Sequence, residues 1–142
     1  GIFINGAGAN DNKDHDGGPN ERQNYPVLEL AERNGNLLGV SLTLNSSPST
    51  NFNLHFYLTL SCTDYQNDYN QGEFYLGTAA ATTDGSGHFF FGASLDLPAD
   101  YVGKGHHLLA TATNSVGSTS EFSNCIRIDG LYQDVFLPIT FK

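Results

Sequence analysis

Apolar residues recur at every second position along much of the chain, and this period limits the fold more strongly than any other feature of the sequence. It is clearest in residues 38–44, where Leu and Val alternate with Gly, Ser and Thr, and in residues 52–60, where Phe and Leu alternate with Asn, His, Tyr and Thr. Successive side chains of a β-strand point to opposite faces, so each run predicts a strand with one buried face.

Turn residues separate these runs from further short strands. The sequence has turn signals at Asn34-Gly35, in the polar loop 45–51 and at Asp84-Gly85, and we expect the last two to close β-hairpins. No stretch has the Ala, Leu, Glu and Lys content of a helix. The other strands are expected at 25–31, 74–83, 88–97, 106–113, 119–128 and 134–141, where Pro138 demotes the last to an edge strand or an extended tail.

This pattern predicts an all-β fold, an immunoglobulin-like antiparallel β-sandwich of about seven or eight strands. We expect Phe56, Phe90 and Phe122 to be its core aromatic residues. A chain of 142 residues is long enough for one such domain. The expected organisation is an N-terminal strand and acidic loop (1–24), the sandwich (25–129) and a C-terminal extended strand or tail (130–142).

The charge balance argues against two classes of partner. Six Lys and Arg face 15 Asp and Glu, which gives a net charge of −9. A protein needs a basic patch to bind the phosphate backbone of a nucleic acid or an anionic membrane surface. We therefore expect neither of these as a partner. No apolar run is long enough to span a bilayer, so we expect no membrane insertion. The chain begins at Gly1 and contains no Met, which predicts a processed or excised piece of a longer product.

Residues 10–26 form an acidic, Asn- and Gly-rich segment that cannot bury enough apolar surface to fold alone. Its oxygen donors Asp11, Asp14, Asp16 and Asn20 are of the type that Ca²⁺ prefers, although their spacing is not that of an EF-hand. The segment is therefore either a calcium-binding loop or a solvated acidic loop.

The two cysteines, Cys62 and Cys125, lie far apart and neither belongs to a CxxC motif. We expect them to form a disulfide, which would stabilise the fold by roughly 4 kcal/mol in the chain-entropy model. Such a bond indicates a secreted or cell-surface protein. Two buried free thiols, or one catalytic Cys, are the alternatives.

Four stretches in order, 14–28, 42–62, 72–91 and 108–125, resemble a bacterial surface-protein module. The first is similar to the signature D-A-D-T-G-P-N-x-x-Q-N-F-P-V-L, and the last to I-T-A-T-A-T-D-x-x-G-N-T-S-E-F-S-x-C. In that family the module is an immunoglobulin-like sandwich that follows a right-handed β-helix in secreted or surface repeat proteins. The resemblance covers residues 2–125 and implies no enzyme activity. Asn114 replaces the family's Asp, which weakens a metal site at that turn. The chain itself contains no β-helix, and residues 1–6 are the one segment that could be a remnant of its last strand.

Glu121, in the T-S-E-F-S motif, is the one distant carboxylate that we add to the calcium ligands. A motif carboxylate in a strand can equally cap a loop by accepting backbone N–H bonds. Asp84 is expected to form a turn rather than to bind a metal. Five tyrosines form either a sugar-stacking platform or ordinary cross-strand pairs: Tyr57, Tyr65, Tyr69, Tyr75 and Tyr101.

The two ends of the chain are short, apolar and β-prone, so each is able to complete the sheet of a neighbouring copy. Pairing within their own domain is the alternative. The assembly residues are Ile2, Phe3, Ile4, Val135, Phe136, Leu137 and Ile139. We therefore expect a non-enzymatic extracellular structural or adhesive module, stabilised by Ca²⁺, that joins copies of itself or neighbouring surface domains into a fibre by strand donation. A carbohydrate-binding module, with glycans as partners, is the alternative.

Overall fold

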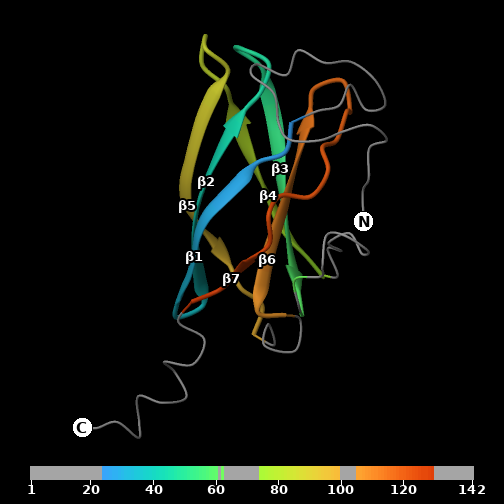
Figure 1. The fold of residues 1–142 in the computed structure, drawn as a ribbon. Coiled ribbons are helices and arrows are strands. Elements are labelled where there is room, and N and C mark those ends of the chain that lie inside the picture. The colour runs from blue at the N-terminus through green and yellow to red at the C-terminus, as the bar shows by residue number, and fades with distance from the viewer. Residues whose placement is uncertain (1–23, 61, 63–73, 100–104, 130–142) are drawn as a thin grey trace, which may run out of the picture.

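The computed structural model describes residues 24–60, 62, 74–99 and 105–129. These residues form two antiparallel sheets that stack as a β-sandwich, which confirms the predicted all-β class (Figure 1). One sheet has the strand order β1-β2-β5 and the other β4-β3-β6-β7. The described part of the chain contains no helix, and therefore none that could cross a membrane. The strands are β1 (Val27–Asn34), β2 (Leu37–Asn45), β3 (Asn51–Thr59), β4 (Phe74–Thr82), β5 (His88–Asp96), β6 (His107–Asn114) and β7 (Ile126–Arg127).

The core lies between β2 and β3, the strands with the clearest sequence period. Every second residue of each strand is buried, and together they provide eight of the core side chains: Leu38, Val40, Leu42, Leu44, Phe52, Leu54, Phe56 and Leu58. The ring of Phe56 in β3 lies 5.7 Å from that of Phe91 in β5, so this contact joins the two sheets. The prediction that Phe56 is a core aromatic residue is confirmed.

The prediction was wrong for the other two aromatic residues. Phe90 is 64% exposed, because in the run Phe89-Phe90-Phe91 the outer two residues point inward and the middle one points to solvent. Phe122 is partly buried, but it packs on the outer face of the four-stranded sheet. Leu60 is also exposed, because β3 ends at Thr59.

One of the three turn signals closes a hairpin. Asn34-Gly35 joins β1 to β2, with Gly35 at φ +64°, as predicted. The loop 45–51 and the Asp84-Gly85 turn do not close hairpins: each carries the chain from one sheet to the other. A turn residue determines the local backbone direction, but an amphipathic strand can either pair with its predecessor or stack on it, and here stacking buries both apolar faces.

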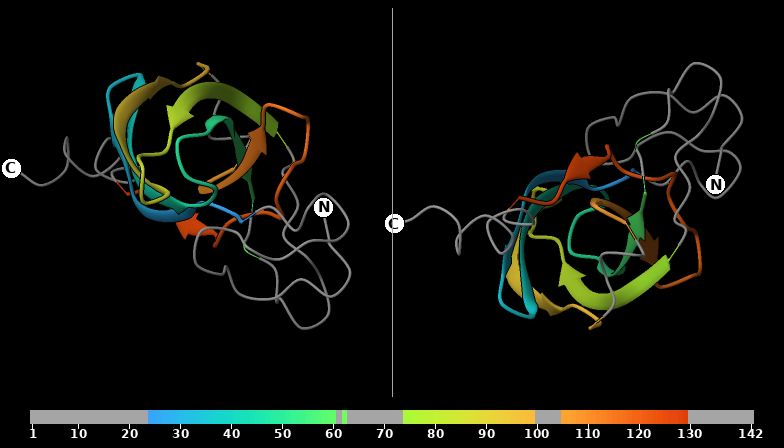
Figure 2. Two further views of the ribbon diagram at one scale, coloured as in Figure 1. Left: turned by 90° about the horizontal axis from the view of Figure 1, so that it is seen from above. Right: turned by 90° about the horizontal axis from the view of Figure 1, so that it is seen from below.

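Residues 118–129 close one side of the sandwich, between β6 and β1, as the end-on views in Figure 2 show. The prediction of a strand over 119–128 was wrong except at β7. Ser120 and Ser123 each donate a backbone N–H to β6, at Ala112 (2.9 Å) and Ala110 (2.8 Å). Their hydroxyl oxygens accept the N–H groups of the same two alanines at 3.0 and 2.9 Å. Two residues, Glu121 and Phe122, thus lie opposite the single residue Thr111 of β6, and the chain between the serines forms a bulge.

The same segment contacts β1 through Asn124 and Asp129. The Asn124 carboxamide accepts the N–H of Leu28 at 2.8 Å and donates to its carbonyl at 3.0 Å, as a neighbouring strand would. Asp129 forms a parallel bridge to β1, donating its N–H to Ala31 O and accepting the N–H of Arg33, both at 2.9 Å. The outer edge of β1 is therefore covered at these positions.

Cys62 and Cys125 form the predicted disulfide, with their Cα atoms 5.7 Å apart. Cys62 lies three residues beyond the end of β3 and Cys125 directly precedes β7, so the bond joins segments that flank two strands of the four-stranded sheet. The bond connects the middle of this sheet to its last strand rather than joining the two sheets.

Candidate functional site

Four aromatic side chains form a continuous group on the outer face of the four-stranded sheet. We call His55, Tyr57, Tyr75 and Phe122 the outer aromatic cluster. The ring of Tyr57 packs edge to face against Tyr75 at 5.5 Å and against Phe122 at 5.3 Å. The rings of His55 and Tyr75 lie 6.0 Å apart, with Nδ1 and the phenol oxygen 3.4 Å from one another.

Strand geometry explains why Tyr57 and Tyr75 face outward together. In β3 the residues on either side of Tyr57, Phe56 and Leu58, point into the core. The register of β4 shifts at this point, so that Phe56 pairs with Gly77 and Tyr57 with Tyr75, leaving Leu76 as the extra residue. Without this bulge Leu76 would lie opposite Tyr57, and Tyr75 would point toward the core.

Phe122 reaches the cluster across β6. Its backbone lies in the bulge between Ser120 and Ser123, on the far side of β6 from β3. Leu109, which pairs with Tyr57, alternates with the inward-facing Leu108 and so lies on this outer face, yet it is fully buried. Leu109 is thus a buried apolar side chain on the same outer face as the Tyr57–Phe122 contact.

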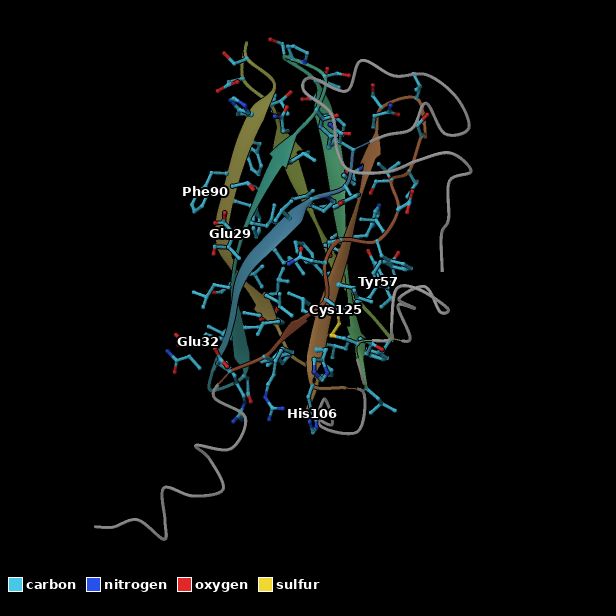
Figure 3. The ribbon with its side chains drawn as sticks, viewed as in Figure 1. Glu29, Glu32, Tyr57, Phe90, His106 and Cys125 are labelled. Carbon is cyan, nitrogen blue, oxygen red and sulfur yellow. A yellow bond between two sulfur atoms is a disulfide. The ribbon has the colours of Figure 1, made fainter. Side chains whose placement is uncertain are left out.

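Over β3, β4 and β6 the outer face of this sheet is uncharged, and the exposed Arg127 belongs to β7, the edge strand opposite β4. None of β3, β4 and β6 contains Asp, Glu, Lys or Arg, although the whole chain has a net charge of −9. Beyond His55 the outward side of β3 continues with the exposed amides Asn53 and Asn51, and Asn51 accepts a hydrogen bond from Thr82 Oγ1 at 2.8 Å. The other sheet carries exposed acidic residues on β1. Figure 3 shows Glu29, Glu32 and Phe90 on one side of the molecule and Tyr57 on the other.

Asp84 is a turn residue, as predicted. Its Oδ1 accepts the N–H groups of His88 at 2.9 Å and Ser86 at 2.8 Å, and these bonds hold the pKa of the exposed carboxyl below its usual value. Asp84 also lines a groove of about 420 Å³ near the end of β2 and the start of β5, with Asn45, His88 and Phe90. One Asp84 carboxylate oxygen is already used for two hydrogen bonds within the turn. The groove is therefore a weaker candidate for a ligand-binding site than the aromatic face.

The structure brings together two of the five tyrosines predicted to form a platform, Tyr57 and Tyr75. Glu121 is partly buried within the bulge that carries Phe122. Among the described residues, no three His, Cys, Asp or Glu side chains lie close enough to hold a metal ion. The remaining predicted residues lie outside the described part of the chain: Tyr65, Tyr69 and Tyr101, the calcium ligands Asp11, Asp14, Asp16 and Asn20, and the assembly residues Ile2, Phe3, Ile4, Val135, Phe136, Leu137 and Ile139.

His55 and Phe122 were not predicted to be members of this face. For His55 the signal was present, because it alternates with the same apolar residues as Tyr57. For Phe122 the two serines three positions apart, which interrupt the period of two, were the available signal. Scanned against protein-family models and compared with curated proteins, the chain gave no match.

Proposed function

We propose that this chain is a non-enzymatic structural and adhesive module of a secreted or cell-surface protein. The observation that carries the proposal is the Cys62–Cys125 disulfide, which joins the segments after β3 and before β7 of the four-stranded sheet. Disulfides persist in oxidising compartments and are rare in the cytosol. In a module whose task is mechanical, such a bond keeps the sheet intact when the surroundings favour unfolding.

The loops at one end of the sandwich support a rigid role. Thr83 Oγ1 donates to Ser47 O at 2.6 Å and accepts the N–H of Thr50 at 3.0 Å, which ties the β4–β5 connection to the β2–β3 loop. Ser49 and Ser46 add backbone bonds to Asp84 O (2.9 Å) and Gly87 O (2.8 Å). Loops that bind one another in this way present a fixed surface, as a spacer or an adhesive contact requires.

The two edges of the three-stranded sheet differ, and this supports assembly by strand donation. β1 is covered by Asn124 and Asp129, whereas β5 pairs with β2 and, within the described residues, with no second strand. β5 pairs with β2 over nine residues without a bulge, contains no Pro and has Asp96 as its one charged residue. Long edges without such protection are templates for another chain. In our proposal β5 accepts residues 1–5 or 135–141 of a second copy.

Matched lysine substitutions test this assembly. Ser94→Lys places a charge on the open edge strand β5, and Leu30→Lys places the same charge on the covered edge strand β1. Light scattering and electron microscopy should show shorter or no polymers for Ser94→Lys and for deletion of one terminal segment, and unchanged polymers for Leu30→Lys. A strictly monomeric parent chain, with or without millimolar Ca²⁺, would contradict the fibre and leave a stand-alone module.

A further inference from the structure

We infer that the outer aromatic cluster, together with Asn53, is a binding site for a neutral glycan. The inference goes beyond the structural role proposed above and does not depend on it, because a module can bind a glycan whether or not it polymerises. It rests on three properties of one face: exposed aromatic surface, adjacent exposed amides and the absence of charged side chains along β3, β4 and β6, three of the four strands of the sheet.

Aromatic surface remains available after the internal contacts of the cluster are made. Tyr57 is held edge-on between Tyr75 and Phe122 and serves mainly to pack them. Tyr75 contacts both His55 and Tyr57 and is still 49% exposed, at the edge strand β4. A ring that is fixed on one side and open on the other loses little conformational entropy when a flat apolar ligand stacks on it.

The ligand must combine a flat apolar face with hydroxyl groups. Pyranose sugars present C–H groups on one face and hydroxyls around the rim, so the apolar face suits Tyr75. The rim suits the phenol oxygen of Tyr75, the imidazole of His55 and the exposed amide of Asn53, which pairs with Ala80 at the β3–β4 junction. An amide both donates and accepts hydrogen bonds and therefore matches vicinal hydroxyl groups.

The charge pattern selects a neutral ligand. The strands β3, β4 and β6 contain no charged side chain, and Arg127 lies on β7 at the edge of the sheet opposite β4, while acidic residues give the whole chain a net charge of −9. An acidic polysaccharide would be repelled by this overall charge and would find no Lys or Arg on β3 and β4, the strands that carry His55, Tyr57 and Tyr75, to neutralise it. A basic peptide would be steered toward the acidic residues elsewhere, among them Glu29 and Glu32 of the opposite sheet.

Titration calorimetry with neutral hexasaccharides tests the site. Cellohexaose, chitohexaose and mannohexaose are the probes, with hexagalacturonate as the acidic counterpart. Because the chain has no Trp, stacking is also visible as a change in its tyrosine fluorescence. We expect at least one neutral probe to bind, Tyr75→Ala to weaken it by about tenfold or more, and Asn53→Ala to weaken it severalfold. Tyr75→Phe keeps the stacking ring and loses only the hydrogen bond of the phenol oxygen, so it should bind more tightly than Tyr75→Ala and less tightly than the parent.

Phe90→Ala is the matched control, because it removes an exposed aromatic ring from the other sheet. It should leave the affinity unchanged. Circular dichroism of each variant separates loss of binding from loss of fold, and Asn53→Ala, at an exposed polar position, provides a second test if Tyr75→Ala unfolds. Failure of every neutral probe to bind, binding of the acidic probe alone, or equal affinities of the parent and both alanine variants would overturn the inference.

Discussion

The side chain of Asn124 binds both backbone polar groups of Leu28, at 2.8 and 3.0 Å, and so takes the place of a paired strand at the start of β1. A register irregularity in β1 lies between Leu28 and Leu30, where the regular pairing with β2 is interrupted. One carboxamide thus stabilises β1 at the position where its own sheet supports it least.

Asn124→Ala should lower the free energy of unfolding by about 1–3 kcal/mol, because it leaves two backbone groups without partners. Asn124→Asp should cost at least as much, since a carboxylate accepts the Leu28 N–H but repels the Leu28 carbonyl. Urea unfolding followed by circular dichroism measures both. Ser115→Ala, at an exposed turn position, is the control, and equal stabilities for all three variants would contradict the backbone-mimic role.

Asp84 and Asn114 form equivalent turns, and this predicts an acid-dependent difference between them. In each turn Oδ1 accepts the N–H groups two and four residues later, and the Gly three residues later has a positive φ (85° and 94°). The pKa of Asp84 is lowered by these backbone bonds. Its contribution to stability is therefore complete above the unfolded pKa of about 3.9 and is lost as the pH falls through the lower folded value.

Asp84→Asn keeps the acceptor oxygen but cannot be protonated in this pH range. The variant should therefore lose less stability than the parent between pH 5 and pH 2, by the contribution of this one carboxylate. Asn114→Asp should make that loss steeper, because it introduces the same carboxylate into the same geometry. Thermal unfolding midpoints of both variants over this pH range are the measurement. Parallel pH profiles for the parent and both variants would show that neither turn is sensitive to protonation.

Gly105 should tolerate no side chain. It has φ +139°, and a Cβ there would overlap the backbone of Thr59, with the Thr59 nitrogen only 2.7 Å away. Gly105→Ala is expected to cost more than about 2 kcal/mol of unfolding free energy, since backbone rather than a flexible side chain must move. Gly77→Ala is the control, because a Cβ at Gly77 meets nothing within 4 Å. Similar melting temperatures for the two variants would refute this close approach.

Reduction of the disulfide should destabilise the sandwich by about 4 kcal/mol, the chain-entropy value for a loop closed over 63 positions. The Cys62→Ser/Cys125→Ser double variant should match the reduced parent in guanidinium unfolding. A double variant as stable as the oxidised parent would leave the bond without a stabilising role.

Calcium binding by the acidic segment is a prediction from the sequence. Millimolar Ca²⁺ should raise the melting temperature, and the joint change Asp14→Asn/Asp16→Asn should abolish that rise. Glu121→Gln separates the two roles considered for Glu121: a ligand would reduce the calcium effect, whereas a loop cap would lower stability equally with and without Ca²⁺. No shift in the parent would show that the segment is a solvated loop.

Alternation in the sequence was sufficient to predict the fold class, the buried faces of β2 and β3, and the outward direction of Tyr57. It could not predict the partner of a strand after a turn: the Asp84-Gly85 signal is real, yet the chain crosses to the other sheet there. The outer aromatic cluster could not be predicted for the same reason, because it depends on how the strands pair. The bulge at Leu76 that turns Tyr75 outward, and the serine pair that carries Phe122 over β6, are both irregularities in pairing, which no single-strand pattern contains.

The parallel bridge between β1 and Asp129 has a mechanical consequence. Tension applied to the chain ahead of β1 and beyond Asp129 pulls the two bridged segments in opposite directions along their common axis. Their hydrogen bonds are then loaded in shear and share the force, instead of breaking one after another as they would if the segments were peeled apart. A pull on these two points therefore loads the bridge between β1 and Asp129 in the direction in which its two hydrogen bonds must break together.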